Sequence, residues 1–501
     1  MVFNFYMKGR EHRDKLTTLQ GGKLMLATWT WIVTVVLSLF FIGMSLRFRK
    51  KSKESFLQFA IAGGTLPFFL LLFTDLATIM GVGNFIGHSS NGFEIGIANI
   101  PFIIGEQGAK ILFALLFAGF AARFTYKSIA ELLNDLILRD KVSRAIVGIL
   151  TSAIMIAWIG GQAKGMGQLF SVFTGADPLP LIFFFSTVFI IYTTVGGMLS
   201  VVWTDFIQGV LLLGIAIWFY IKVYAKIDFS YSTLKTMLAE VNASHLTQIS
   251  ISPWEVVTLF VTGCFGVLAA QMYWQRCFAA NNPKAASRAM LYSGIAAILF
   301  TILASVSGMI VKALNPNVDS ANAVPWLILN EMTQTAALVF FILIFLAAIS
   351  SASSLLHSAA IVIVNDLIIP FSKEMKDAKL IVLSKWLVVL VGIFSTLAAN
   401  YSESIISLFS FAYTLTGGGV VPVLIVGLLW KKRKHEKFEM GTQNSRVSVW
   451  GGRIGLLSGA IASVLFGILW GVLISTVLTV IVSFILPNKT DLNRTPEFES
   501  A

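Results

Sequence analysis

The sequence predicts an all-α protein that crosses a membrane 12 or 13 times. Its 501 residues are 56% hydrophobic and only 12% charged, whereas soluble globular domains carry about 25% charged residues. Apolar runs of roughly 20 residues recur along the chain, and each is long enough to cross a bilayer as a helix. The alternating segments of roughly ten residues that are typical of outer-membrane barrels are absent.

The expected spans follow the apolar runs. In chain order they are 25–46, 66–92, 97–122, 144–173, 180–198, 200–224, 254–279, 288–312, 335–368, 379–400 and 403–430. A last apolar block covers 452–486. As one helix it would be about 50 Å long, which is too long for one ordinary span and barely enough for two.

The net charge of +12 does not indicate a nucleic-acid partner, because the basic residues stand between the apolar runs. They gather at 47–53, 123–144, 276–288 and 431–437. Loops rich in Lys and Arg face the cytoplasm, so we expect these segments on the cytoplasmic side of the cell (inner or plasma) membrane. The N-terminus then lies outside, although four basic residues near it disagree: Lys8, Arg10, Arg13 and Lys15.

Two spans contain clustered glycines. One is TDLATIMGVGNFIGHSSNG at 74–92, and the other is YTLTGGGVVPV at 413–423. Irregular backbone inside a membrane is tolerated only where it faces protein or a water-filled cavity. A glycine-interrupted span early in the chain therefore indicates a broken helix at a transport site. The alternative is that the glycines only let neighbouring helices approach closely.

The run AAISSASSLLHS at 347–358 places Ser350, Ser351, Ser353 and Ser354 in the middle of an apolar span. At about 100° per residue, the four hydroxyls fall within an arc of roughly 160° and about 6 Å of axial rise. Hydroxyl and carbonyl oxygens are hard ligands that suit a small cation. A single membrane serine usually bonds back to its own helix, an explanation that is weaker for four serines on one face.

Asp205 lies between two apolar spans, in TTVGGMLSVVWTDFIQGVLLLG at 193–214. An intramembrane carboxylate is a candidate functional group. The ordinary alternative is that Thr204 or Asp205 caps the next helix.

Four motifs resemble those of the sodium:solute symporter family. They are GGMLSVVWTDFIQ at 196–208, WQRCFAANNPKAASRAM at 274–290, AAISSASSLLHSAAIVIVND at 347–366 and PVLIVGLLWKK at 422–432. Their order and spacing are also similar to those of the family.

The resemblance implies a fold of two inverted five-helix repeats, like that of the bacterial leucine transporter. The repeats would cover 66–224 and 254–430, with an extracellular loop at 225–253. Residues 1–65 would form a tail, one extra transmembrane helix and a basic loop. Residues 431–501 would form a basic loop, a C-terminal helix or helical hairpin and a tail. Inverted repeats place substrate and ions near the bilayer midplane, beside broken helices.

The resemblance also implies sodium as the coupling ion. A first sodium site would use the carbonyls of Ala77, Met80 and Ala347 and the hydroxyls of Ser350 and Ser351. A second site, which only some relatives have, would use Asp205, Ser350, Ser353 and Ser354. The presence of both sets suggests two sodium ions per cycle rather than one.

The substrate is less well defined. Asn84 matches a substrate-contacting position in sugar-carrying relatives, but the acidic residue that those relatives use in the next helix falls on Ile103 here, which disfavours a sugar. Glu106 either pairs with Lys110 at spacing i, i+4 or faces the cavity and meets a substrate amine.

Other polar residues of the predicted spans are weaker candidates. Gln107, Gln162 and Gln271 are expected hydrogen-bonding groups for a substrate. Lys164 either meets a carboxylate or extends its ammonium to the membrane surface. His88 is expected to be a packed histidine with satisfied hydrogen bonds.

We therefore predict a sodium-coupled secondary symporter, not an enzyme, that imports an amino acid or another small organic ion by alternating access. No HExxH, GxSxG or P-loop motif favours an enzyme. The alternatives are an ion channel, which lacks support from any repeated pore loop, and a transporter-like sensor, for which the short segment after Pro487 leaves little room. The expected partners are the solute, sodium ions and the lipid bilayer, with a monomer as the working expectation.

Overall fold

The computed structural model describes residues 2–48, 50, 53–433 and 435–488, with side chains described from residue 24 onward. These residues form helices, two isolated β-bridges and no sheet. Twelve helical segments among them are long and apolar enough to cross a membrane, and the shorter apolar helix Phe68–Ile79 adds to them. The all-α polytopic class and the predicted number of spans are thus confirmed.

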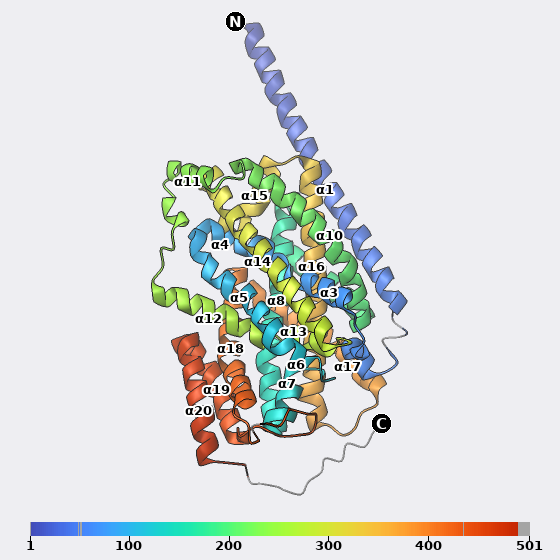
Figure 1. The fold of residues 1–501 in the computed structure, drawn as a ribbon. Helices are drawn as coiled ribbons and strands as arrows, with labels where there is room; N and C mark the ends of the chain where they lie inside the picture. Colours follow the sequence, from blue (N-terminus) through green and yellow to red (C-terminus); the bar gives the residue numbers. More distant parts are fainter. Residues whose placement is uncertain (1, 49, 51–52, 434, 489–501) are drawn as a thin grey trace.

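The main helices pack side by side, some upright, such as α8 and α16, and others strongly tilted, such as α12 and α14 (Figure 1). They are α1 (Val2–Phe48), α3 (Phe68–Ile79), α4 (His88–Ile95), α5 (Ile100–Phe113), α8 (Lys141–Thr174), α9 (Pro178–Val195), α10 (Met198–Tyr224), α12 (Pro253–Ala269), α13 (Gln271–Phe278), α14 (Pro283–Leu314), α16 (Gln334–Val362), α17 (Asp377–Asn400), α18 (Ile405–Leu429), α19 (Val449–Phe466) and α20 (Ile468–Ile485). The shorter helices are α2 (Phe56–Ile61), α6 (Gly119–Ala121), α7 (Ile129–Leu133), α11 (Tyr231–Glu240) and α15 (Ala323–Glu331).

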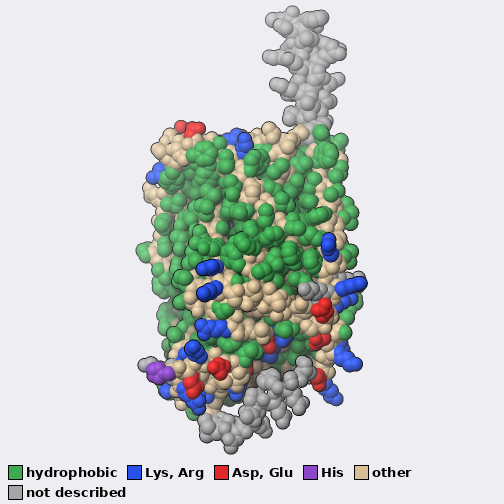
Figure 2. Space-filling view, turned by 45° about the vertical axis from the view of Figure 1, so that its right-hand side comes forward, with side chains coloured by type: hydrophobic (Ala, Val, Ile, Leu, Met, Phe, Trp, Pro, Cys, Tyr) green, Lys and Arg blue, Asp and Glu red, His purple; other side chains and the backbone are tan. Residues whose placement is uncertain are grey.

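The outer surface is apolar over most of its height. Figure 2 shows this belt, with the Lys and Arg side chains gathered below it. The same end carries α7 and the end of the described chain, whereas α1 begins at the opposite end (Figure 1). This arrangement agrees with the predicted orientation, in which the basic loops lie in the cytoplasm and the N-terminus lies outside.

The glycine-rich span at 74–92 is a broken helix, as the sequence predicts. Helix α3 ends at Ile79, and Met80 has a non-helical backbone with ψ of 50°. The helix resumes as a π-helical turn at Gly83–Gly87 and continues into α4. Gly96, with φ of +57°, then turns the chain into α5.

The second glycine-rich span is not interrupted. Helix α18 is continuous from Ile405 to Leu429 and includes Pro422. Its glycines instead allow close packing, because a Cβ at Gly418 would collide with the side chain of Ser463 on α19. The alternative of close helix approach therefore holds for this span.

A second break lies in the span at 254–279, at Ala270, where the chain has neither glycine nor proline, the nearest glycine being Gly266. Helix α12 ends at Ala269, and α13 begins at Gln271 after the extended backbone of Ala270. Taking each broken helix as one, five membrane-crossing helices fall within 66–224 and five within 254–430, and each set begins with a broken helix. This order supports the inverted-repeat arrangement, while the repeat boundaries themselves stay a prediction.

The C-terminal apolar block forms two helices rather than one. Gly467, with φ of +91°, separates α19 from α20. The two helices pack against each other, and both pack against α18 (Figure 1).

Candidate functional site

A small cavity lies beside the break between α3 and α4. It is lined by Ile79, Gly81, Gly83, Asn84, Glu106, Trp158, Gln162 and Phe409. Its volume is about 10 Å³, close to the room that one water molecule needs. The cavity therefore brings the break together with one carboxylate, two amides and two aromatic rings.

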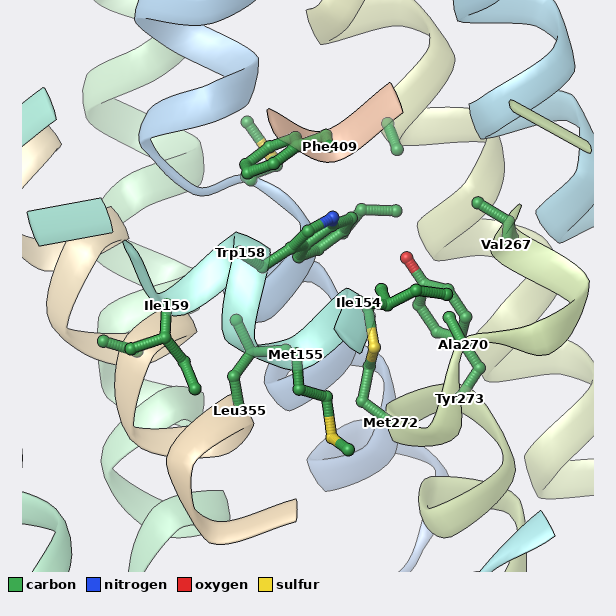
Figure 3. Close-up of a cluster of buried hydrophobic side chains, with 14 of the residues drawn as sticks. Ile154, Met155, Trp158, Ile159, Val267, Ala270, Met272, Tyr273, Leu355 and Phe409 are labelled. Atoms are coloured by element: carbon green, nitrogen blue, oxygen red, sulfur yellow. The ribbon is translucent and has the colours of Figure 1, made fainter. Parts of the chain in front are cut away.

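Apolar side chains enclose the cavity along the membrane normal. Trp158 stacks on Phe409, with 5.4 Å between ring centroids. Figure 3 shows Trp158 between Phe409 on one side and Met155 and Leu355 on the other. Since α8 runs outward from the cytoplasm, Met155 lies on the cytoplasmic side of Trp158. Met155 and Leu355 are both fully buried, so apolar side chains fill the space on this side of Trp158.

The backbone oxygens at the end of α3 face the serines of α16. The Ser350 hydroxyl donates to the Ala77 carbonyl at 2.9 Å, and the Ser351 hydroxyl donates to the Thr78 carbonyl at 2.7 Å. The next carbonyl, that of Ile79, accepts from the Asn84 amide at 2.8 Å. Side chains thus satisfy three carbonyls that the interrupted helix leaves free.

Most of the predicted first sodium site comes together where the carbonyls of Ala77 and Thr78 meet the hydroxyls of Ser350 and Ser351, a contact that we call the seam. Ser350 also lies 3.1 Å from the Ala347 carbonyl, and Ser351 packs against Gly81, next to Met80. The donor set consists of hydroxyl and carbonyl oxygens, which suit a hard cation. The C-terminal end of α3 also carries the negative end of the helix dipole. The residues present therefore fit a sodium ion.

The predicted second site is only partly assembled. One oxygen of Asp205 accepts from Ser354 at 2.8 Å and from Thr74 of α3 at 2.7 Å. The other oxygen is buried without a hydrogen-bond partner. Ser353 instead bonds the carbonyl of Ser350 in its own helix. Ser350 belongs to the seam with α3 and does not contact Asp205.

Arg276 lies next to this carboxylate. Its guanidinium donates to Ser354 at 3.1 Å and to Thr78 at 2.5 Å. The prediction that 276–288 is a basic loop is wrong for Arg276, because this residue lies in α13 and is 1% exposed. A fixed cation thus shares the Ser354 hydroxyl with Asp205.

Asp75 and Lys110 form a buried ion pair that the sequence reading did not predict. Both side chains are 0% exposed. Asp75 also accepts from Ser293 of α14, and its second oxygen lies 3.8 Å from the Arg276 guanidinium. The Lys110 ammonium stands 4.8 Å from the Tyr273 ring centroid. The expected pair between Glu106 and Lys110 is therefore wrong.

Glu106 faces the cavity, as one of the two alternatives proposes. It accepts from Tyr413 at 2.7 Å and from Gln107 at 2.8 Å. The oxygen that accepts from Gln107 also lies 3.1 Å from Nε2 of His88. The other ring nitrogen of His88, Nδ1, lies 3.3 Å from the side-chain nitrogen of Asn99. His88 is thus a packed histidine with hydrogen-bond partners, as expected. Glu106 supplies the only carboxylate among the residues described as lining this cavity.

The two amides of the cavity also support the break. Gln162 accepts from the Val82 backbone N–H at 2.8 Å and donates to the Trp158 carbonyl at 3.2 Å. Asn84 binds the Ile79 carbonyl, as described above. Their remaining polar atoms are the ones available to a solute.

Gln271 lies outside the cavity, so its assignment to the substrate site is corrected. Its side chain accepts from the Ile129 N–H at 2.9 Å and donates to the Lys127 carbonyl at 3.1 Å. It therefore anchors the start of α7 on the cytoplasmic side. Lys164 lines a separate recess near the outer end of α18 and donates to the Ser402 carbonyl.

Several groups at the site were missed from the sequence, although all but one of them had a signal. Asp75 stands in the glycine-rich motif as an intramembrane carboxylate. Thr74 and Thr78 flank it at helical spacing, and Arg276 stands in a motif that resembles the family. Tyr413 had no such signal, because one tyrosine in an apolar span is ordinary.

A broken helix whose free carbonyls face hydroxyls, beside a closed cavity between two sets of five helices, is the arrangement of a secondary transporter. Comparison with solved structures agrees. A sodium-coupled sialic acid symporter, solved in a substrate-bound outward-open state, has a TM-score of 0.76 over 92% of this chain and 98% of its own, at 21% identity. The fold is thus the five-plus-five inverted-repeat fold of the leucine transporter.

The model of the sodium:solute symporter family matches residues 59–437, and the chain belongs to this family. The sodium/sialic acid symporter of Proteus mirabilis (strain HI4320) is 25% identical over 442 residues, which cover 83% of this chain and 87% of the relative. The sodium/pantothenate symporter of Haemophilus influenzae (strain ATCC 51907) is 24% identical over 412 residues, which cover 76% and 81%.

The buried pair of Asp75 and Lys110 gives a stability prediction. We expect Asp75→Asn and Lys110→Met each to lower the free energy of unfolding by about 3–5 kcal/mol, because each leaves one buried charge without its partner. The double variant should be more stable than either single variant. Thermal unfolding of purified protein in detergent measures this order.

The matched control is Lys226→Met, which breaks the more exposed pair with Glu331. A pair of this kind contributes about 0–1 kcal/mol. If the double variant lost as much free energy of unfolding as the two single variants together, Asp75 and Lys110 would not stabilise each other.

Proposed function

We propose that this protein uses a sodium gradient to import a small organic solute with an amine group, such as an amino acid. The observation that carries the proposal is the position of Glu106. This carboxylate is 2% exposed and lines the cavity beside the break of α3. A buried carboxylate favours a cationic partner, and the ring faces of Trp158 and Phe409 add attraction for a cation.

In the proposed mechanism, sodium binds at the seam between α3 and α16. In this structure the Ser350 hydroxyl donates to the Ala77 carbonyl, and the Ser351 hydroxyl lies 3.4 Å from the same oxygen. Rotation of the two hydroxyls would turn their oxygens toward an ion, together with the carbonyls of Ala347 and Met80. Sodium would then hold α3 against α16 and fix the cavity residues that follow the break. Release of sodium to the cytoplasm would loosen the seam and the solute together.

A second sodium ion is proposed at Asp205. The support is its buried oxygen without a hydrogen-bond partner, next to Ser354 and Thr74. Arg276 shares Ser354 with Asp205, so an ion there would compete with the guanidinium. One charge moved across 100 mV is worth about 2.3 kcal/mol, so each ion adds more than tenfold to the accumulation of solute.

A second candidate substrate is an organic anion. The relatives named above carry sialic acid and pantothenate, both of which are acids. The amide groups of Asn84 and Gln162 can donate to a carboxylate. Channel and sensor functions receive no support from these relatives, which are symporters by name. The plasma membrane and the monomeric state stay predictions.

Ser351→Ala tests the first sodium site. We expect the variant to need about tenfold more sodium for half-maximal thermal stabilisation, because it loses one oxygen ligand of a charged ion, worth roughly 1.5–3 kcal/mol. The measurement is the melting temperature as sodium replaces potassium at constant ionic strength.

The control for this variant is Ser384→Ala, a buried serine that bonds only the Leu380 carbonyl of its own helix. It should leave the sodium dependence unchanged. An unaltered half-saturating concentration in Ser351→Ala would exclude a sodium ion at this seam.

Asp205→Asn tests the second ion. Equilibrium binding of radiolabelled sodium to the purified protein should give two ions per chain for the native sequence and one for the variant, because the amide lacks the charge that offsets dehydration of the ion. The exposed residue Asp177 supplies the control Asp177→Asn. Equal numbers of bound ions in Asp205→Asn and the native protein would remove the second site.

Glu106→Gln tests the substrate class. A thermal-shift screen in sodium should identify stabilising solutes among amines and zwitterions, and the variant should need at least about tenfold more of them, since a charged hydrogen bond is worth roughly 1.5–3 kcal/mol. The control is Glu374→Gln, on an exposed cytoplasmic turn. If carboxylates without an amine group stabilised the native protein and Glu106→Gln equally, the result would favour an organic anion as the substrate.

A further inference from the structure

A long groove opens on the lipid-facing surface between α5, α12 and α18, away from the transport cavity. Its volume is about 480 Å³. The wall is apolar and includes Leu112, Leu116, Phe117, Leu268 and Ile425. Leu116 is 65% exposed, so the groove is open to the surrounding membrane.

One end of the groove is basic. Arg123, Lys431 and Lys437 line it there, together with Phe438. The Lys431 ammonium stands 5.0 Å from the Phe438 ring centroid. These cations follow the cytoplasmic ends of the α5–α6 segment and of α18, and Figure 2 shows Lys and Arg concentrated at that end of the molecule.

The nearby acidic group does not cancel this charge. Glu436 is bound by Arg433 at 2.7 Å, and Lys431 contacts only its backbone carbonyl. Three cations therefore face one end of an apolar groove, and the lining contains no carboxylate among the described residues.

We propose that this groove binds an anionic phospholipid of the cytoplasmic leaflet. Its phosphate would lie among Arg123, Lys431 and Lys437, and an acyl chain would lie along Leu116 and Leu268. Basic recesses between membrane helices on the cytoplasmic side suit such headgroups. From Leu112 to Phe120 the helix rises by roughly 12 Å, which is most of one leaflet of a bilayer core about 30 Å thick.

The position of the groove gives the lipid a role in transport. Helices α5 and α12 pack against each other, α12 also packs against α18, and α5 and α18 contribute Glu106 and Phe409 to the cavity. A lipid in the groove would bridge these elements and oppose their separation. This inference does not depend on the identity of the solute.

Native mass spectrometry of the full chain in a neutral detergent tests the proposal. The probes are dioleoyl phosphatidylglycerol and dioleoyl phosphatidylcholine, titrated separately, with glycerol phosphate as a competitor. We expect phosphatidylglycerol to bind more tightly than phosphatidylcholine. The variant Arg123→Gln/Lys431→Gln/Lys437→Gln should bind it about 100-fold more weakly, at about fivefold per cation.

The matched control is Lys284→Gln/Lys373→Gln/Lys379→Gln, which removes the same charge from exposed positions outside the groove. It should keep the native affinity. If the first triple variant does not purify in folded form, Lys437→Gln alone should weaken binding about fivefold.

Three results would overturn the proposal. Equal affinity for the two lipids would show an apolar groove without headgroup recognition. Equal loss in both triple variants would show general charge attraction. Displacement of phosphatidylglycerol by glycerol phosphate at equal concentration would show a phosphate site that needs no lipid.

Discussion

The fold depends on how the chain satisfies the carbonyls that the break in α3 releases. Inside a bilayer, an unpaired backbone carbonyl costs several kcal/mol. Here Ser350, Ser351 and Asn84 bind the carbonyls of residues 77–79, and Gln162 binds the N–H of Val82. The break is therefore held at one place by side chains from three helices. The oxygens that hold it are also the ones that a hard cation prefers.

The same seam is surrounded by balanced charge. Asp75 and Asp205 face Lys110 and Arg276, and all four are at most 1% exposed. Burial of such charges is costly unless they are paired. Ion pairs of Asp75 join α3 to α5 and α13, and the hydrogen bond from Thr74 to Asp205 joins α3 to α10. A movement of α3 would have to separate or exchange these partners. Any ion that enters near Asp205 changes this balance, which gives a physical route from ion binding to helix movement.

The surroundings of the cavity are apolar where the path must close and polar where a solute must be recognised. Trp158 and Phe409 stack on each other and line the cavity, while Met155 and Leu355 lie on the side of Trp158 away from Phe409 (Figure 3). Glu106 holds its position through Tyr413 and Gln107. Its hydrogen bonds come from neutral groups, with only His88 able to add a charge, and the proposed amine substrate rests on this arrangement.

The sequence by itself determined the membrane class, the number of spans and the break at 74–92, because apolar run length and clustered glycines are local signals. It also predicted, through motifs that resemble a known family, that Ala77, Ser350 and Ser351 lie together. The tertiary structure decided which charges pair: Lys110 binds Asp75 rather than Glu106, and Gln271 binds the start of α7 rather than the cavity. It also decided that α18 is continuous and that α12 ends at Ala269. These outcomes depend on which helices meet inside the membrane. Contacts between residues far apart in the chain cannot be inferred from local hydrophobic periodicity.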